Sequence, residues 1–275
     1  PASPRRAYLD YNATAPLCSE AKVAMIEALD VVGNPSSVHM EGRRARGVVE
    51  SARESVARLV GAKPSEVVFT SGASEANAWV MAQPWQTILT SGIEHDSVLA
   101  PAHAAKCNVV ELATGRDGVV CVEQIAEYVL KHGVPRPAVI ALQMANNETG
   151  VIQPVGEVAE FARAHGILMH SDAVQAAGRV PVDFAALGLD TMAISAHKLG
   201  GPKGIGALII RDHLDLVPML RGGGQERRRR AGTENVAAIA GFGAAAEAAH
   251  AELRSMAAVE SLRDDLEAHI RAISP

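Results

Sequence analysis

Short apolar runs alternate with longer stretches that carry one apolar face, and this alternation is the strongest pattern in the sequence. The short runs are rich in β-branched residues and occur at Val67-Val68-Phe69, Thr87-Ile88-Leu89, Val139-Ile140-Ala141-Leu142, Ile167-Leu168-Met169 and Ala207-Leu208-Ile209-Ile210. Their length and composition predict buried strands.

Between these runs, apolar residues recur at helical spacing. They do so at Ala45, Val48, Val49, Ala52, Val56 and Leu59, and again at Val155, Val158, Ala159 and Ala162 before Gly166. Each such helix has one face to bury. Strands that alternate with helices predict an α/β fold, in which a mainly parallel sheet is covered by helices on both sides and ligands bind at the carboxyl ends of the strands.

The last part of the chain is continuously helix-like. From about Gly241 there is no further strand pattern, and the sequence passes through the alanine-rich stretch 244–251 to Ser274-Pro275. In a two-domain enzyme, residues 241–273 could be the helix that leads into a second domain. We therefore expect this chain to hold only a fragment of that domain.

Composition narrows the possible function classes. The chain has 275 residues, 48% of them hydrophobic, which is enough for one large core with or without a small satellite domain. Its net charge of −5 gives no electrostatic reason to bind nucleic acid or an anionic membrane. No stretch approaches the roughly 20 apolar residues of a membrane span. Cys18, Cys107 and Cys121 form no CxxC pair, so we expect no zinc, no disulfide framework and a cytoplasmic location.

Lys198 lies just past a predicted strand, because it follows the apolar run Thr191-Met192-Ala193-Ile194. A lysine at a strand end can form a Schiff base if burial or nearby positive charge lowers its pKa. The alternative is an ordinary surface lysine in a glycine-rich turn.

Two further loops carry polar groups after strands. Asp172 could pair with a protonated pyridine nitrogen and Gln175 could hydrogen-bond a ring hydroxyl, although Asp172 could equally be a helix N-cap. In the stretch Phe69–Asn77, a helix that starts near Ser74 could hold a phosphate with its backbone N–H groups, or Ser71 or Ser74 could merely cap it.

Two more strand-end loops complete the set. His95 could stack on a flat cofactor and move protons, or be structural. Asn146-Asn147 could hydrogen-bond a cofactor hydroxyl or a substrate carboxylate, or form a polar turn. Because these four loops and Lys198 follow five separate strands, the sheet should gather them at one edge, and this convergence favours a single site.

The run Arg227–Arg230 lies in a glycine-flanked loop with Thr233. Such runs are commonly solvated faces or weak nucleic-acid patches. We favour a phosphate role, since arginine makes bidentate contacts to phosphate oxygens and the loop could reach the site of a neighbouring subunit.

These motifs together resemble the NifS-like cysteine desulfurases of the class V aminotransferase group, with selenocysteine lyases as close relatives. Besides the loops above, the resemblance rests on Tyr8–Pro16, Gly33–His39 and Arg230–Asn235. It implies the fold type I of PLP-dependent transferases, with a seven-stranded type of sheet and a partial small C-terminal domain. The cofactor would be pyridoxal 5′-phosphate (PLP).

The resemblance also implies a role for each site residue. Lys198 would be the Schiff-base lysine, Asp172 the partner of the pyridine nitrogen, and Gln175 the donor to the ring hydroxyl. His95 would stack on the ring and share catalysis with Lys198. Further cofactor contacts would come from Ala73, Ser74, Ser195 and His197 at the phosphate, from Asn147 beside the ring and substrate, and from Thr233 reaching over from the second subunit of a homodimer.

The implied chain organisation has three parts. Residues 1–14 would be an N-terminal segment packing with the small domain, 15–240 the large PLP-binding domain, and 241–275 a linking helix and C-terminal fragment. The implied reaction converts L-cysteine to L-alanine and passes the sulfur, as a persulfide, to a sulfur-acceptor or scaffold protein for iron–sulfur cluster assembly.

One part of the family pattern has no counterpart up to Pro275. Family members carry a nucleophilic cysteine and a substrate-carboxylate arginine in the C-terminal region, and Cys18, Cys107 and Cys121 match no part of the cysteine loop. Selenocysteine lyase, a related PLP lyase and a catalytically silent PLP-binding fragment therefore stay open as alternatives.

Overall fold

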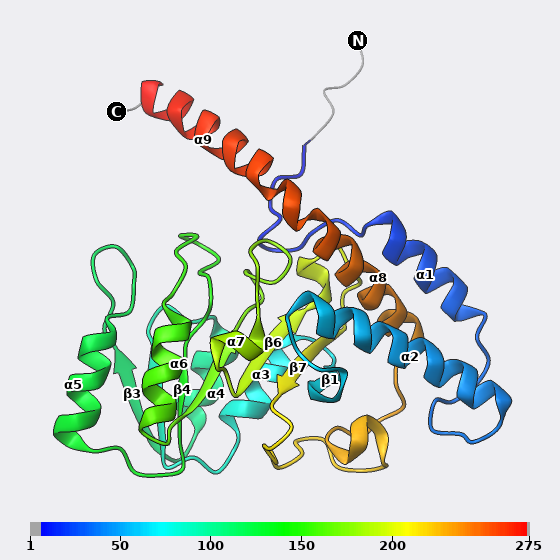
Figure 1. Cartoon of the computed structure of the whole chain (residues 1–275), viewed down its shortest axis with the longest axis horizontal. Coiled ribbons are helices and arrows are strands. Elements are labelled where there is room, and N and C mark those ends of the chain that lie inside the picture. Colours follow the sequence, from blue (N-terminus) through cyan, green and yellow to red (C-terminus); the bar gives the residue numbers. More distant parts are fainter. Residues whose placement is uncertain (1–6, 274–275) are drawn as a thin grey trace.

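The computed structural model describes residues 7–273, and its centre is one sheet with the strand order β1-β7-β6-β5-β4-β2-β3 (Figure 1). β7 pairs antiparallel with both of its neighbours, and all other pairs are parallel, so β1 to β6 run in one direction. The strands are β1 (Val67–Thr70), β2 (Thr87–Ser91), β3 (Asn108–Leu112), β4 (Ala138–Ala141), β5 (Leu168–Asp172), β6 (Thr191–Ser195) and β7 (Gly206–Ile210). The predicted α/β fold with a seven-stranded, mainly parallel sheet is confirmed.

Helices cover both faces of this sheet, which explains why its strands are apolar throughout. In β1, for example, Val67 and Phe69 belong to one hydrophobic core and Val68 to the other. The larger core lies against α2 (Met40–Leu59), α5 (Val122–His132), α6 (Val155–Ala164), α7 (Phe184–Leu187) and α8 (Val236–Glu252). The smaller core lies against α3 (Ala73–Met81) and α4 (Asp96–Ala104). Alternate residues of one strand therefore serve two cores.

The helix before the last one, α8 (Val236–Glu252), packs against two helices from the start of the chain. α8 contacts both α1 (Ser19–Leu29) and α2, so this helix is part of the layered body. It also continues through residue 240, where a domain boundary was predicted. A short turn at Leu253–Ser255 leads into α9 (Met256–Ile273), which extends away from the body and has no buried residue (Figure 1). The predicted division of the chain into residues 1–14, 15–240 and 241–275 stays a prediction. Residues 1–6 and 274–275 of the first and last parts lie outside the described residues. Within residues 7–273, no helix is both long and apolar enough to cross a membrane.

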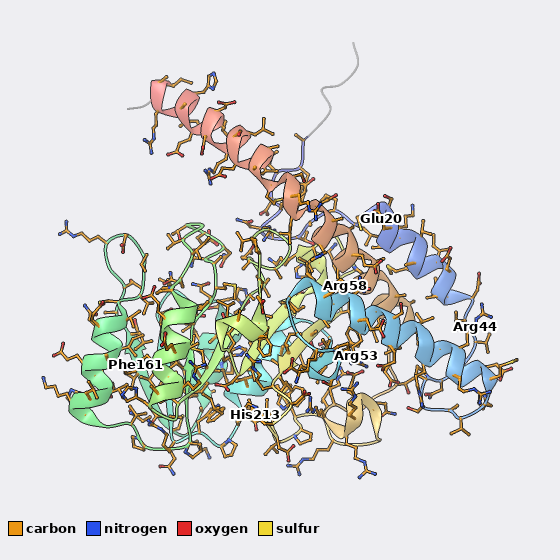
Figure 2. All side chains as sticks on the ribbon, in the orientation of Figure 1. Glu20, Arg44, Arg53, Arg58, Phe161 and His213 are labelled. Carbon is orange, nitrogen blue, oxygen red and sulfur yellow. The ribbon has the colours of Figure 1, made fainter. Side chains whose placement is uncertain are left out.

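A buried ion pair ties the arginine-rich loop to the body. Arg53 of α2 (labelled in Figure 2) donates from Nη1 and Nη2 to the two carboxylate oxygens of Glu226, at 2.8 and 2.9 Å. Glu226 also accepts a hydrogen bond from the backbone N–H of Phe69 at 2.9 Å. The backbone is left-handed at Glu226, Arg227 and Arg228, with φ of 45°, 57° and 68°. Such conformations cost free energy in residues other than glycine, so the buried pair holds the loop in a shape it would not adopt alone.

We expect Arg53→Leu to lower the free energy of unfolding by about 3–5 kcal/mol, because it leaves the Glu226 carboxylate buried without its partner. Arg58, on the same helix, makes an exposed pair with Glu247 at 3.4 Å and is the matched control. Arg58→Leu should cost no more than about 1 kcal/mol. Urea unfolding of both variants measures the difference, and equal losses would mean that the buried pair has no special role.

Candidate active site

Five strand-end loops meet around one cavity of about 1060 Å³ at the carboxyl edge of the sheet. They follow β1, β2, β4, β5 and β6, as the sequence predicted. Nine of the ten predicted cofactor residues line this cavity: Ala73, Ser74, His95, Asn147, Asp172, Gln175, Ser195, His197 and Lys198. The tenth, Thr233, is exposed on the arginine-rich loop and does not line it in the single chain.

Asp172 is a buried carboxylate at the end of β5 that faces the cavity. Its Oδ1 accepts a hydrogen bond from the Val174 N–H at 3.0 Å, and its Oδ2 accepts one from Asn77 Nδ2 at 2.7 Å. Burial raises the pKa of Asp172, and these two hydrogen bonds oppose the rise. Among residues 7–273, Asp172 has no ion-pair partner within 4.0 Å. A ligand with a positively charged N–H group would therefore complete its surroundings.

Lys198 ends the short turn Ala196–Lys198 that follows β6, and it is half-buried at the cavity wall. Its Nζ donates to the carbonyl oxygen of Asn12. Burial and the guanidinium of Arg179 lower the pKa of Lys198, whereas Asp172 and Asp10 act in the opposite direction. A larger fraction of Lys198 is therefore the neutral, nucleophilic amine than in a surface lysine.

The N-terminal segment also borders the cavity. Asn12 donates from Nδ2 to the Asn147 carbonyl at 2.9 Å, and its own carbonyl accepts from Gln175 Nε2 at 3.0 Å. The Ala15 N–H donates to the His197 carbonyl at 2.8 Å. Sequence reasoning missed the contact of Asn12 with Lys198 and Gln175, because residues 7–18 form no strand or helix whose periodicity could place them.

The start of α3 provides free donors at the same cavity. Gly72 is its N-cap and no side chain caps it, so the alternative of a serine cap is not realised. The Glu75 carboxylate accepts instead from the Ser71 N–H at 2.7 Å, outside the helix. The backbone N–H groups at Ala73 and Ser74 thus remain suited to an anion at the positive end of the helix.

The arginine-rich loop lies beside this helix start. Arg230 makes a two-pronged contact with Glu75, from Nε at 2.9 Å and from Nη2 at 3.1 Å. Its guanidinium is therefore occupied by a carboxylate, in contrast to the phosphate contact that we expected of the arginine run. Because Glu75 also holds Ser71, this ion pair connects the loop of Thr233 to the candidate phosphate-binding turn.

His95 and Glu94 lie side by side after β2 but in opposite surroundings. His95 is exposed at the cavity and caps α4, accepting at Nδ1 from the Ser97 N–H at 3.0 Å. Glu94 is buried, and its Oε1 accepts from Ser91 Oγ at 2.6 Å and from the Gln143 N–H at 3.0 Å. Burial raises the pKa of Glu94 to about 8. Glu94 thus connects the loops after β2 and β4, a role that no sequence pattern indicated.

Comparison with known proteins identifies the family. The model of the class-V aminotransferase family matches residues 7–274. The chain belongs to this family. Cysteine desulfurase IscS of Dictyoglomus turgidum is 41% identical to it over 272 residues, which cover 94% of this chain and 68% of that protein. A selenocysteine lyase of Xenopus tropicalis is 39% identical over 310 aligned positions, covering 98% and 70%.

A solved structure supports the same assignment. The NifS-like protein from Rickettsia africae superimposes with a TM-score of 0.92 at 35% sequence identity, covering 96% of this chain and 75% of that one. Class-V aminotransferases of the cysteine desulfurase type use PLP. The family assignment therefore implies PLP as the ligand of this cavity.

Glu94 makes the stability of this family member depend on pH. Since its folded-state pKa is about 8 and its ordinary value 4.5, the folded state binds more protons than the unfolded state between these values. The Glu94 contribution is therefore present below about pH 4.5 and is lost as pH rises toward about 8. Glu94→Gln keeps the acceptor oxygen and removes the titration.

We expect Glu94→Gln to gain stability relative to the unmodified chain as pH rises through this window, by at most about 1.4 kcal/mol per pH unit. Urea unfolding at several pH values measures the difference. Parallel stability curves for the two proteins would show that Glu94 is ionised in the fold.

Proposed function

We propose that this chain carries the PLP site of a cysteine desulfurase, with Lys198 as the residue that attaches the cofactor. The observation that carries the proposal is the joint position of Asp172 and Lys198 at one cavity, with the start of α3 at the same cavity. Sequence identity of about 40% to a desulfurase over nearly the whole chain supports the same reaction class.

The residues that line the cavity fit both ends of a PLP molecule, its pyridine nitrogen and its phosphate. At one end, the buried Asp172 carboxylate has no cation beside it within the described residues, and a protonated pyridine nitrogen would supply one. At the other end, the N–H groups of Ala73 and Ser74 suit a phosphate, and Ser195 and His197 line the same cavity. When bound, the protonated pyridine ring withdraws electrons from the substrate and so stabilises negative charge at its α-carbon.

The side chains of the chain then have distinct tasks. Lys198 would hold the cofactor through Nζ, and its neutral amine would serve as the base for the α-proton of the amino acid. His95 offers a flat ring to stack on the cofactor, and Gln175 offers an amide to its hydroxyl oxygen. Asn147, which lines the cavity, would contact the substrate, and Thr233 would reach the phosphate of a second subunit in a homodimer.

L-cysteine is the proposed substrate, and a sulfur-acceptor protein in the cytoplasm is the proposed recipient of its sulfur. Selenocysteine lyase is the second candidate, since the lyase of Xenopus tropicalis is almost as similar as the desulfurase. None of the residues that line the cavity distinguishes sulfur from selenium. Product assays with each amino acid separate the two.

We expect Lys198→Ala to lose the absorbance band of lysine-attached PLP, because this band requires the cofactor to be conjugated with the lysine nitrogen and differs from that of unattached PLP. Lys203 lines the same cavity and is the matched control. Lys203→Ala should still show this band. An unchanged spectrum in Lys198→Ala would place the attachment elsewhere.

None of the three cysteines lines the described cavity. Cys18 caps α1 through Sγ, Cys121 precedes α5, and Cys107 lies before β3, at the opposite edge of the sheet from the strand ends. Removing sulfur from cysteine needs a thiolate that attacks the substrate sulfur at the site.

We therefore expect these 275 residues alone to bind PLP but to release no alanine and sulfide from cysteine at a catalytic rate. Quantifying both products in the presence of a reductant tests this. Turnover that disappears in Cys18→Ala, Cys107→Ala or Cys121→Ala would show that one of these residues is the sulfur acceptor.

A further inference from the structure

A single buried amide connects the two sides of the candidate cofactor site. Asn77 on α3 is fully buried, and its Nδ2 donates to Asp172 Oδ2 at 2.7 Å and to Ser97 Oγ at 2.8 Å. Its Oδ1 lies 3.0 Å from Nε2 of the fully buried His170. Every polar position of the amide except one lone pair of Oδ1 is therefore in use.

The hydrogen-bond chemistry of its neighbours fixes the orientation of this amide. Asp172 Oδ2 accepts from the Asn77 NH₂ group at 2.7 Å, and Asn77 Oδ1 faces Nε2 of His170 at 3.0 Å. Burial lowers the pKa of His170 to about 3, so this imidazole is neutral. It donates from Nε2 to Asn77, and its Nδ1 accepts from the Thr191 hydroxyl at 2.9 Å. The neutral His170 thus prevents the side-chain amide of Asn77 from flipping.

The second branch of the network reaches His95. Because Ser97 Oγ accepts from Asn77, its hydroxyl proton is free to bond Nδ1 of His95 at 2.8 Å. The same Nδ1 also accepts from the Ser97 N–H. The lone pair of Nδ1 is therefore occupied from two sides, and the ring proton lies on Nε2, which has no hydrogen-bond partner among residues 7–273. His95 accordingly meets a ligand in the cavity as a donor at Nε2.

We propose that Asn77 is a positioning residue with two tasks: it holds the Asp172 carboxylate, and it keeps the ring proton of His95 on Nε2. His170 in turn fixes the orientation of the Asn77 amide. A ligand that places positive charge against Asp172 would then find His95 already in the donor tautomer. That last step rests on the proposed PLP site, whereas the positioning itself is a property of the chain without any ligand.

The test uses the ligand-free chain and two NMR readouts. The ring nitrogens of His95 and His170 report their tautomers, and the ¹³C carboxyl signal of Asp172 reports its titration. The charged and titratable groups that face Asp172 are His95, Lys198 and Glu94, with the neutral His170 behind Asn77. Assignments follow from the signals lost in His95→Gln, His170→Gln and Asp172→Asn.

We expect Asn77→Leu, which keeps the volume of the side chain, to raise the midpoint of the Asp172 titration by about 1–2 pH units. This is the shift that follows from losing one hydrogen bond to a charged group. His170 should change from one tautomer to a mixture, because its Nε2 loses its acceptor. Gln83→Leu is the matched control: this amide lies just after the same helix and is buried and bonded to Trp79 and Val217. It should leave both readouts unchanged.

Ser97→Ala separates the two branches and keeps the experiment informative if Asn77→Leu does not fold. It should move the ring nitrogens of His95 and leave the Asp172 titration within a few tenths of a unit. Unchanged Asp172 and His170 signals in folded Asn77→Leu, or an unchanged His95 in Ser97→Ala, would overturn the proposal. Since no readout involves PLP, failure of cofactor binding would leave this result standing, and the reverse holds as well.

Discussion

The common direction of six strands is the constraint on which the rest of this structure depends. β7 is inserted antiparallel between β1 and β6, and this keeps β1 parallel to β2 through β6. The carboxyl ends of five of these strands meet at one edge, so Ala73 and Lys198 line one cavity although they lie far apart in the sequence. The direction of the strands thus brings three groups together: a helix start that suits an anion, a carboxylate that suits a cation, and a lysine amine. This placement follows from the backbone of the sheet.

The surroundings of three of the buried acidic residues, Glu226, Glu94 and Asp172, determine their different roles. Glu226 is fully paired by Arg53 and the Phe69 N–H, so it fixes a strained loop and offers nothing to a ligand. Glu94 has no ion-pair partner among residues 7–273 and burial raises its pKa to about 8, so it joins two loops mainly in its neutral form. Asp172 receives two N–H donors but no cation within the described residues, and one side of it faces the cavity. Of the three acids, Asp172 alone combines partial stabilisation with access to a ligand.

Sequence reasoning identified the strands that are buried on both faces, because their apolar runs are continuous. It missed β3, since this edge strand is half-exposed and its Asn-Val-Val-Glu-Leu sequence carries polar residues at both ends of an apolar pair. It also left α4 unassigned, where Pro101 lies inside the helix and the cap is a histidine rather than a serine or aspartate. The nine predicted residues that line the cavity could be predicted because each lies at the end of a strand or in the segment that follows it.

The contacts that the sequence could not indicate are those between distant segments without periodicity. Asn12 reaches Lys198 from an irregular segment, and Arg230 is taken up by Glu75 rather than left free for a phosphate. Asn77 lies in a stretch that already predicted a helix, yet its contacts with Asp172 and Ser97 depend on how α3 and α4 lie across the sheet. Such pairings follow from tertiary packing, which local patterns do not encode.

We propose that the strand-end cavity is one PLP site, with the ring nitrogen of the cofactor at Asp172 and its aldehyde carbon at Lys198. A crystal structure of the chain grown with PLP tests this most directly. We expect continuous density from the Lys198 Nζ to the cofactor, a ring nitrogen within hydrogen-bond distance of Asp172, and the phosphate at the start of α3. Density for PLP at another lysine, or a phosphate placed against Asp172, would contradict it.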